Sequence, residues 1–246
     1  MNVRVFASEQ EAVVACAAGV AAAIRESPSL VLGLPTGRTP LDVYREMVEL
    51  HRRGGLDCAR VTTFNLDEFL GLPPDDPASF RAYMERHLLQ HVNVAPERQH
   101  FFDGSAERAE RECARYDAQL AAVGGLDLVL LGIGPNGHVA FNEPGDTLQA
   151  SSHRVRLTRE TRLGLAPFFA NDVSRVPLAA VTLGMAALLQ ARRVILLAFG
   201  VSKAAAVTAM VRGPITPHLP ASFLQLHRDA EVWLDPAAAS GLETSC

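Results

Sequence analysis

The sequence has few cysteines, and none of them are spaced as a metal or redox motif. The four are scattered over the chain at Cys16, Cys58, Cys113 and Cys246, and no CxxC occurs. This spacing argues against a disulfide framework or a zinc site and favours reduced thiols. Because reduced thiols are typical of the cytosol, we expect a cytoplasmic protein.

The chain also lacks a surplus of positive charge and a long apolar run. Lys and Arg total 23 against 27 Asp and Glu, which gives a formal net charge of -4. Without a broad basic field, we expect no nucleic-acid partner. No stretch approaches the roughly 18 consecutive apolar residues that cross a bilayer, so we expect no membrane partner either.

What the sequence does contain is a series of short apolar runs separated by helical stretches. Hydrophobic residues make up 48% of the 246 residues and charged residues 20%, as in an ordinary globular protein. Near-continuous hydrophobicity fits strands of a mainly parallel sheet covered on both faces. We therefore expect residues 1–246 to form a single, doubly wound α/β domain with helices on both faces of the sheet. The expected strands lie at residues 3–6, 30–34, 61–66, 126–133, 194–199 and 231–234.

A glycine-containing turn follows the second apolar run, in LVLGLPTGRTPLDVY at residues 30–44. Gly37 lies in the turn, and Thr39 is the expected N-cap of the next helix. Such a turn aims backbone amides and a helix N-terminus at an anion, and Thr36 and Arg38 could add hydrogen bonds to a phosphate. The alternative is a purely structural turn, since neither a Walker motif nor GxGxxG is present.

Two adjacent carboxylates, Asp67 and Glu68, follow the third apolar run. The carboxyl ends of parallel strands open onto the binding crevice of such a sheet, and a carboxylate placed there can abstract a proton. The alternative is that one of them caps the following turn.

The densest group of polar residues is in GIGPNGHVAFNEPG, directly after the fourth run. Four side chains that donate, accept or titrate fall within eight residues: Asn136, His138, Asn142 and Glu143. His138 titrates near neutral pH, and Glu143 could orient its ring, as a general acid–base pair requires. Lys203, in the helix start after the fifth run, is a candidate phosphate ligand or an ordinary solvated lysine.

These segments resemble the glucosamine-6-phosphate deaminase family, which belongs to a broader group with the 6-phosphogluconolactonases. The resemblance spans about residues 30–227, and GHVAFNEPG is its most specific part. The matching stretches are LGLPTGRTPLDVY, TFNLDEFLGLP, GIGPNGHVAFNEPG, VPLAAVTLG and ASFLQLH.

The resemblance implies that the ring of an amino-sugar phosphate is opened and that the sugar is isomerised from aldose to ketose. The amino group is then released as ammonia, which gives fructose 6-phosphate. His138 would open the ring, with Glu143 and Asn136 holding or tuning it. Asp67 would carry a proton between C2 and C1. The resemblance implies no metal and no organic cofactor, and it leaves open a monomer or a homo-oligomer.

Three positions depart from the family's usual pattern. Asn136 stands where some members have aspartate, and Arg38 where the loop usually has Gly or Ser. In the lid segment, about residues 150–175, Pro167 replaces a phosphate-binding arginine. We expect Arg38 to supply the missing guanidinium, with Arg162 as a second candidate.

The main prediction is deamination of glucosamine 6-phosphate, with galactosamine 6-phosphate as the nearest variant. The alternatives are a 6-phosphogluconolactonase and a sugar-phosphate sensor without turnover. The FNEP stretch and Asp67 argue against the lactonase. The presence of Asp67, His138 and Glu143 together argues against the sensor.

Overall fold

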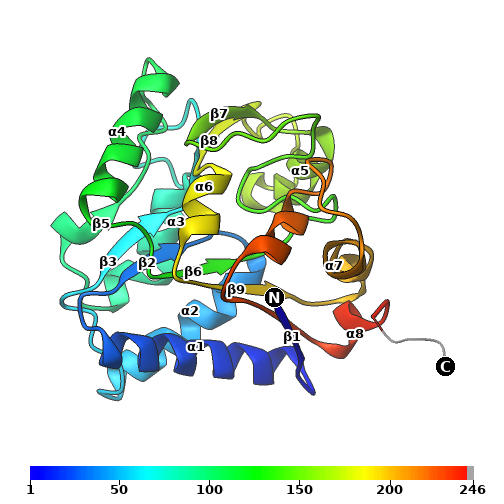
Figure 1. Cartoon of the computed structure of the whole chain (residues 1–246). Coiled ribbons are helices and arrows are strands. Elements are labelled where there is room, and N and C mark those ends of the chain that lie inside the picture. The colour runs from blue at the N-terminus through cyan, green and yellow to red at the C-terminus, as the bar shows by residue number, and fades with distance from the viewer. Residues whose placement is uncertain (243–246) are drawn as a thin grey trace.

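The computed structural model describes residues 1–242 and contains two sheets (Figure 1). Cys246 lies outside the described residues, while Cys16, Cys58 and Cys113 are buried free thiols, as predicted. The large sheet has the order β1 (Asn2–Val5), β10 (Ala230–Leu234), β9 (Arg193–Ala198), β6 (Leu128–Leu131), β2 (Val31–Leu34), β3 (Thr62–Asn65) and β5 (Gln99–His100). The small sheet has the order β4 (Asp67–Phe69), β8 (Ala179–Thr182) and β7 (His153–Arg156).

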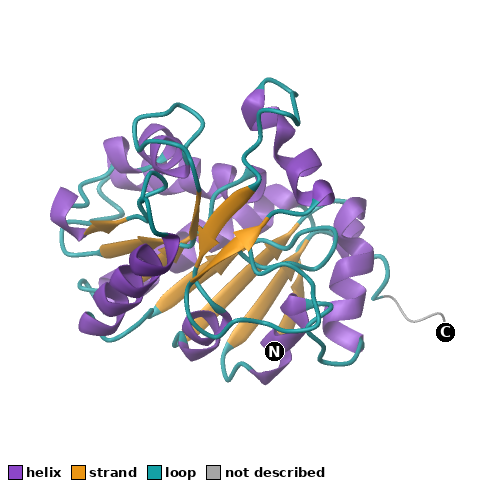
Figure 2. Ribbon diagram, turned by 90° about the horizontal axis from the view of Figure 1, so that it is seen from above, coloured by secondary structure: helices purple, strands orange, loops and turns teal. Residues whose placement is uncertain are grey.

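All strand pairs of the large sheet are parallel, and helices pack on both of its faces (Figure 2). The doubly wound α/β fold is therefore confirmed, and all six predicted strands are present. The α-helices are α1 (Glu9–Glu26), α2 (Arg38–Arg52), α3 (Phe80–His87), α4 (Ala109–Ala122), α5 (Arg159–Leu165), α6 (Met185–Gln190), α7 (Ala204–Arg212) and α8 (Pro236–Ala239).

The side chains of each central strand alternate between two separate hydrophobic cores. In β6, Leu128 and Leu130 join the core under α1, α2 and α3, whereas Val129 and Leu131 join the core under α4, α6, α7 and α8. Successive side chains of a strand point to opposite faces, so a continuous apolar run is what a sheet covered on both sides requires.

The small sheet is antiparallel and was not predicted from the sequence. Its strand β4 follows β3 after one residue, and it pairs with β8, which in turn pairs with β7. The segment predicted as a lid contains β7, α5 and the short 3-10 helix η3 (Ala166–Phe169). A third, mostly aromatic cluster packs between this segment and the small sheet; it consists of Phe69, Phe80, Phe141, Leu157, Phe169, Val176 and Ala180.

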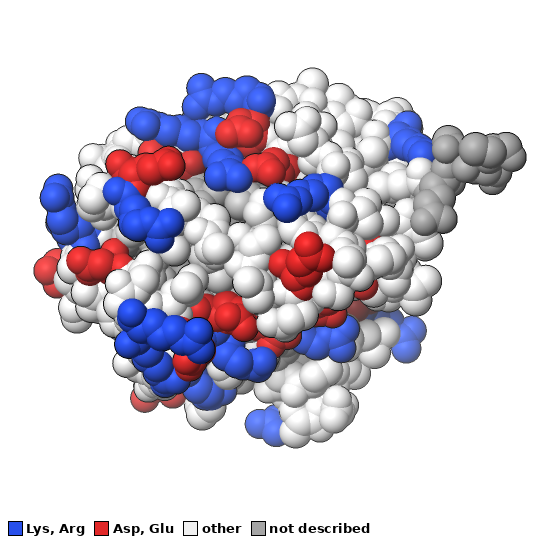
Figure 3. Space-filling model, turned by 90° about the horizontal axis from the view of Figure 1, so that it is seen from below, with Lys and Arg blue, Asp and Glu red and all other residues white. Residues whose placement is uncertain are grey.

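Positive and negative side chains are interspersed on the face of the molecule shown in Figure 3. Among residues 1–242, no helix combines the length and the apolar character needed to cross a membrane.

Candidate active site at the carboxyl edge of the sheet

The predicted site segments follow four strands that are neighbours in the large sheet, in the order β9, β6, β2 and β3. Lys203 follows β9, His138 follows β6, the turn at 36–39 follows β2, and Asp67 follows β3. Because these strands are parallel, their carboxyl ends meet at one edge of the sheet. Segments as far apart in the chain as residues 36 and 203 are thereby brought to the same side of the molecule.

Asp67 is a buried carboxyl group without a hydrogen-bond partner. The residue is 5% exposed, and neither carboxylate oxygen accepts a hydrogen bond from any described residue; Oδ1 is fully buried. Burial raises the pKa of Asp67 well above its usual range, and the charge of Glu68 raises it further. An unpaired buried acceptor is costly, so this oxygen is suited to a proton or donor brought by a ligand.

Glu68 has the capping role that the sequence left open for either carboxylate. Its Oε1 accepts from the N–H groups of Phe69 at 2.8 Å and Phe80 at 2.9 Å, and its Oε2 accepts from the N–H of Arg81 at 2.9 Å. Burial raises the pKa of Glu68 to about 7, against these three hydrogen bonds, which lower it. Glu68 thus satisfies the first turn of α3 and leaves Asp67 as the carboxyl group available for chemistry.

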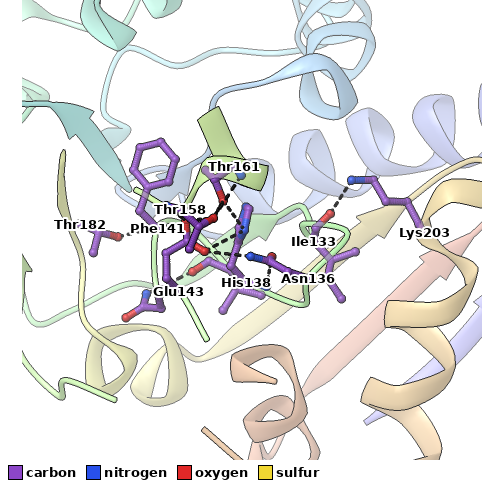
Figure 4. Close-up of polar contacts among 11 residues, drawn as sticks. Ile133, Asn136, His138, Phe141, Glu143, Thr158, Thr161, Thr182 and Lys203 are labelled. Atoms are coloured by element: carbon purple, nitrogen blue, oxygen red, sulfur yellow. Dashed lines mark hydrogen bonds and ion pairs between the residues drawn. The ribbon is translucent and has the colours of Figure 1, made fainter. Parts of the chain in front are cut away.

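His138, Glu143 and Asn136 form one connected group (Figure 4). Asn136 Nδ2 donates to Glu143 Oε2 at 2.9 Å, and Asn136 Oδ1 accepts from the backbone N–H of His138 at 3.2 Å. Glu143 Oε2 also lies 3.7 Å from His138 Nδ1. A carboxylate on this side favours a proton on Nδ1, which leaves Nε2 free to exchange a proton with a ligand.

The charge of His138 is set by burial and by two neighbours. Burial lowers the pKa of the imidazole, Glu143 raises it, and the positive charge of Lys203 lowers it. The net direction is downward, so the ring is neutral at pH 7 and can act as a proton acceptor.

Two threonines that the sequence analysis missed complete this group. Thr158 donates to Glu143 Oε1 from both its backbone N–H and its hydroxyl, each at 3.3 Å. Thr161 Oγ1 lies 3.4 Å from His138 Nδ1. Thr158 is the N-cap of α5, and a threonine before a helical stretch with a second threonine three residues later was the available signal.

The glycines around His138 are required by close contacts. A Cβ added to Gly134 would lie 2.3 Å from Cε1 of the His138 ring, and one added to Gly137 would lie 2.1 Å from Cδ1 of Leu219. Gly137 also has a φ of +85°, which side chains rarely adopt. The glycine-rich turn therefore allows the imidazole to lie directly against the backbone.

The helix start after β2 differs from the prediction by two residues. Helix α2 begins at Arg38 with Gly37 as its N-cap, so Thr39 lies within the first turn and is not the cap. The reason is the φ of +122° at Gly37, which ends the extended chain and lets the helix begin at once. Thr36, Arg38 and Thr39 still surround this N-terminus, as an anion-binding turn would require.

Lys203 and Arg38 supply positive charge beside this turn. Lys203 Nζ donates to the carbonyl oxygen of Ile133 at 2.8 Å, which directs the amine to the end of β6 (Figure 4). Burial lowers the pKa of Lys203, and the charge of Arg38 lowers it further, so the two cations are close enough to interact. Arg38 is exposed, and among residues 1–242 it makes neither a hydrogen bond nor an ion pair through its side chain.

Arg162 and Pro167 have different positions in the lid segment. Arg162 donates from Nη2 to the carbonyl oxygens of Val173 at 2.7 Å and Val176 at 2.9 Å, so its guanidinium holds the lid together. Pro167 is exposed in η3 and has no side-chain donor. Arg162 is thus tied to the backbone of its own segment through Nε and Nη2, whereas Arg38 makes no side-chain contact of this kind among the described residues.

The fold is that of an α/β enzyme, with candidate acid–base groups and a candidate anion-binding turn at the carboxyl edge of a parallel sheet. In the described part of the chain, no three His, Cys, Asp or Glu side chains are placed to hold a metal ion. The sequence pattern of the family described as glucosamine-6-phosphate isomerases/6-phosphogluconolactonase matches residues 6–233. The chain belongs to this family.

Individual relatives agree with this assignment. A protein named glucosamine-6-phosphate deaminase 1 from Giardia intestinalis is 46% identical over 92% of this chain and 85% of its own length. A glucosamine-6-phosphate deaminase from Bacillus velezensis is 41% identical over 98% of this chain and 100% of its own.

Solved structures give the same result. The structure of a monomeric glucosamine-6-phosphate deaminase superposes with a TM-score of 0.95 at 40% identity, covering 98% of this chain and 100% of that one. A 6-phosphogluconolactonase from Leishmania guyanensis has a TM-score of 0.78 at 24% identity, covering 99% of both chains, which shows the shared fold.

Proposed function

We propose that this protein is a glucosamine-6-phosphate deaminase, which converts glucosamine 6-phosphate and water to fructose 6-phosphate and ammonia. The observation that carries the proposal is the unpaired, buried carboxyl group of Asp67 at the same sheet edge as the His138–Glu143–Asn136 group. The relatives cited above, at 41% and 46% identity over most of their length, support the deaminase over the lactonase branch.

The first step opens the pyranose ring. Neutral His138 accepts the proton of the C1 hydroxyl at Nε2 and delivers a proton to the ring oxygen as the C1–O bond to it breaks. Glu143 stabilises the charged imidazole that forms between the two transfers, and Asn136 and Thr158 hold Glu143 in place. The product of this step is the open aldehyde.

The second step moves a proton between neighbouring carbons. Asp67 accepts the proton from C2 while the carbonyl oxygen on C1 takes a proton from the substrate's ammonium group, which leaves an enol with a neutral amino group on C2. The carboxyl group of Asp67 then returns its proton to C1. The resulting C2 iminium ion takes up water and releases ammonia, which leaves the ketone of fructose 6-phosphate. One carboxylate can serve both carbons because its proton returns only one bond away.

The phosphate is held by the turn at 36–39 together with Lys203 and Arg38. Thr36, Gly37 and Thr39 offer backbone and hydroxyl donors, and the two cations match the charge of the phosphate. Arg38 replaces the guanidinium that the lid lacks at Pro167. Arg162 acts on this site indirectly, since it supports the lid.

An ammonia-release assay tests the proposed function. Glucosamine 6-phosphate, galactosamine 6-phosphate and unphosphorylated glucosamine are compared, and hydrolysis of 6-phosphogluconolactone is followed in parallel. We expect ammonia from glucosamine 6-phosphate and no lactone hydrolysis. Lactone hydrolysis without ammonia release would establish the lactonase, and binding without product would establish a sensor.

We further propose a cytoplasmic monomer. The buried free thiols and the monomeric state given for the superposed deaminase support this. Light scattering on the purified chain measures the mass directly, and a mass near 26.5 kDa is expected.

A further inference from the structure

All three tyrosines of the chain are buried, and each hydroxyl donates to a backbone carbonyl at the carboxyl edge of the sheet. Tyr44 of α2 donates to Pro35 at 2.5 Å, and Tyr83 of α3 donates to Gly37 at 2.6 Å. Tyr116 of α4 donates to Asn65 at 2.7 Å, two residues before Asp67. Two of the three hydroxyls therefore hold the turn after β2, and the third holds the end of β3.

The two bonds to the turn fix the direction of its amide groups. In a trans peptide, the carbonyl and the following N–H point in opposite directions, and the described residues contain no cis peptide. Because Tyr44 draws the carbonyl of Pro35 to one side, the N–H of Thr36 points to the other. In the same way, the bond from Tyr83 to the carbonyl of Gly37 fixes the direction of the N–H of Arg38.

The amide groups set in this way are free. Among residues 1–242, none of the four backbone N–H groups at 36–39 donates a hydrogen bond. Unpaired amides at a helix N-terminus favour an anion, and the side chains of Lys203 and Arg38 add positive charge beside them. Rotation of either peptide would turn a carbonyl oxygen toward the anion and remove a donor.

We propose that Tyr44 and Tyr83 are positioning residues that hold the turn at 36–39 in its phosphate-binding conformation. This inference rests on the proposed function for the identity of the ligand. Burial raises the pKa of both hydroxyls, which keeps them protonated as donors. Tyr83 also contacts the predicted lid segment: the centroid of its ring lies 6.0 Å from that of Phe168, in an edge-to-face arrangement.

Removal of each hydroxyl alone tests the proposal. Tyr44→Phe and Tyr83→Phe should each raise KM for glucosamine 6-phosphate about tenfold, with kcat within about twofold of wild type. The dissociation constant of inorganic phosphate, measured by calorimetry, should rise by a similar factor. A purely structural role would lower the active fraction and the Tm without changing either constant.

Tyr116→Phe is the matched control, because it also removes a buried tyrosine hydroxyl from a backbone carbonyl. This hydroxyl holds the segment before Asp67, so kcat should fall while phosphate binding stays at the wild-type value. Unchanged phosphate binding in a folded Tyr83→Phe variant would overturn the proposal, as would an equal weakening in Tyr116→Phe. If Tyr44→Phe does not fold, the Tyr83 variant decides alone.

Failure of the proposed function has a different signature. If the wild-type chain releases no ammonia from glucosamine 6-phosphate, the deaminase assignment fails. The phosphate dissociation constants of the variants still decide whether the two hydroxyls position the turn.

Discussion

Asp67 and Glu68 are adjacent in β4, but their carboxyl groups have opposite surroundings: Glu68 accepts three backbone hydrogen bonds, and Asp67 accepts none from the described residues. Successive side chains of a strand point to opposite faces, so β4 separates the two groups. One carboxylate anchors α3, and the other remains available to react. The contrast in bonding distinguishes the two roles, although the two residues look equivalent in the sequence.

The first prediction concerns Asp67→Asn, which keeps the shape of the side chain and removes the base. We expect kcat to fall about 10²- to 10⁴-fold, because the proton transfer between C2 and C1 loses its acceptor. Phosphate binding and Tm should not fall. Burial disfavours the charged form of Asp67, which is why its pKa is raised, and a neutral asparagine avoids that cost. Substantial ammonia release by this variant would disprove the role of Asp67.

The second prediction is a shift in the pH profile on removal of the Glu68 charge. Asp67 must be ionised to accept a proton, so kcat/KM rises with pH through its raised pKa. Glu68→Gln removes the negative charge beside Asp67, so the pKa of Asp67 falls. The acid limb of the plot of kcat/KM against pH therefore moves to lower pH. The position of the limb is independent of the amount of folded enzyme. An unshifted limb would show that another group controls it.

The third prediction concerns the guanidinium of Arg38. Arg38→Ser should raise KM for glucosamine 6-phosphate roughly 10- to 100-fold, because a hydrogen bond to a charged group is lost. Arg45→Ser is the control: it removes the same charge from the same helix, but Arg45 is an exposed residue paired with Asp42. An unchanged KM in the Arg38 variant would exclude this residue from the phosphate site.

The fourth prediction concerns the close contact between Gly134 and the imidazole. In Gly134→Ala, the new methyl group must displace the His138 ring, and a shift of about 1 Å can lower kcat about 100-fold. Gly132→Ala is the control, since a Cβ there meets no atom within 4 Å. Similar kcat values for the two variants would show that the position of the ring does not limit the rate.

Six of the seven strands of the large sheet could be predicted from the sequence, whereas the two-residue strand β5 and the small sheet could not. Strands such as β9 are buried on both faces and appear as long apolar runs. The strand β4 of the small sheet has only three residues, and β7 reads HRVR, with one apolar residue and with alternate residues exposed. So short and polar a segment carries no readable periodicity, and it forms a strand because β8 pairs with it.

The contacts of the candidate site could also be predicted only in part. Asn136, His138 and Glu143 fall in one short motif, and their contacts could be anticipated from it. The contacts of Tyr83 and Thr161 could not, because they join residues 46 and 23 positions apart. Such contacts depend on how α3 and α5 pack, which is a property of the tertiary structure.

The aromatic cluster beneath the lid has a consequence for engineering this scaffold. Phe69 lies two residues after the proposed base, and its ring packs edge-on against Phe169 of the predicted lid segment. Phe141 lies three residues after the imidazole and belongs to the same cluster, in which its ring contacts that of Phe69. The predicted lid segment and the proposed reactive groups are thus joined through one hydrophobic cluster. A chimera that imports a relative's lid will keep its activity only if the facing phenylalanines are transplanted with it.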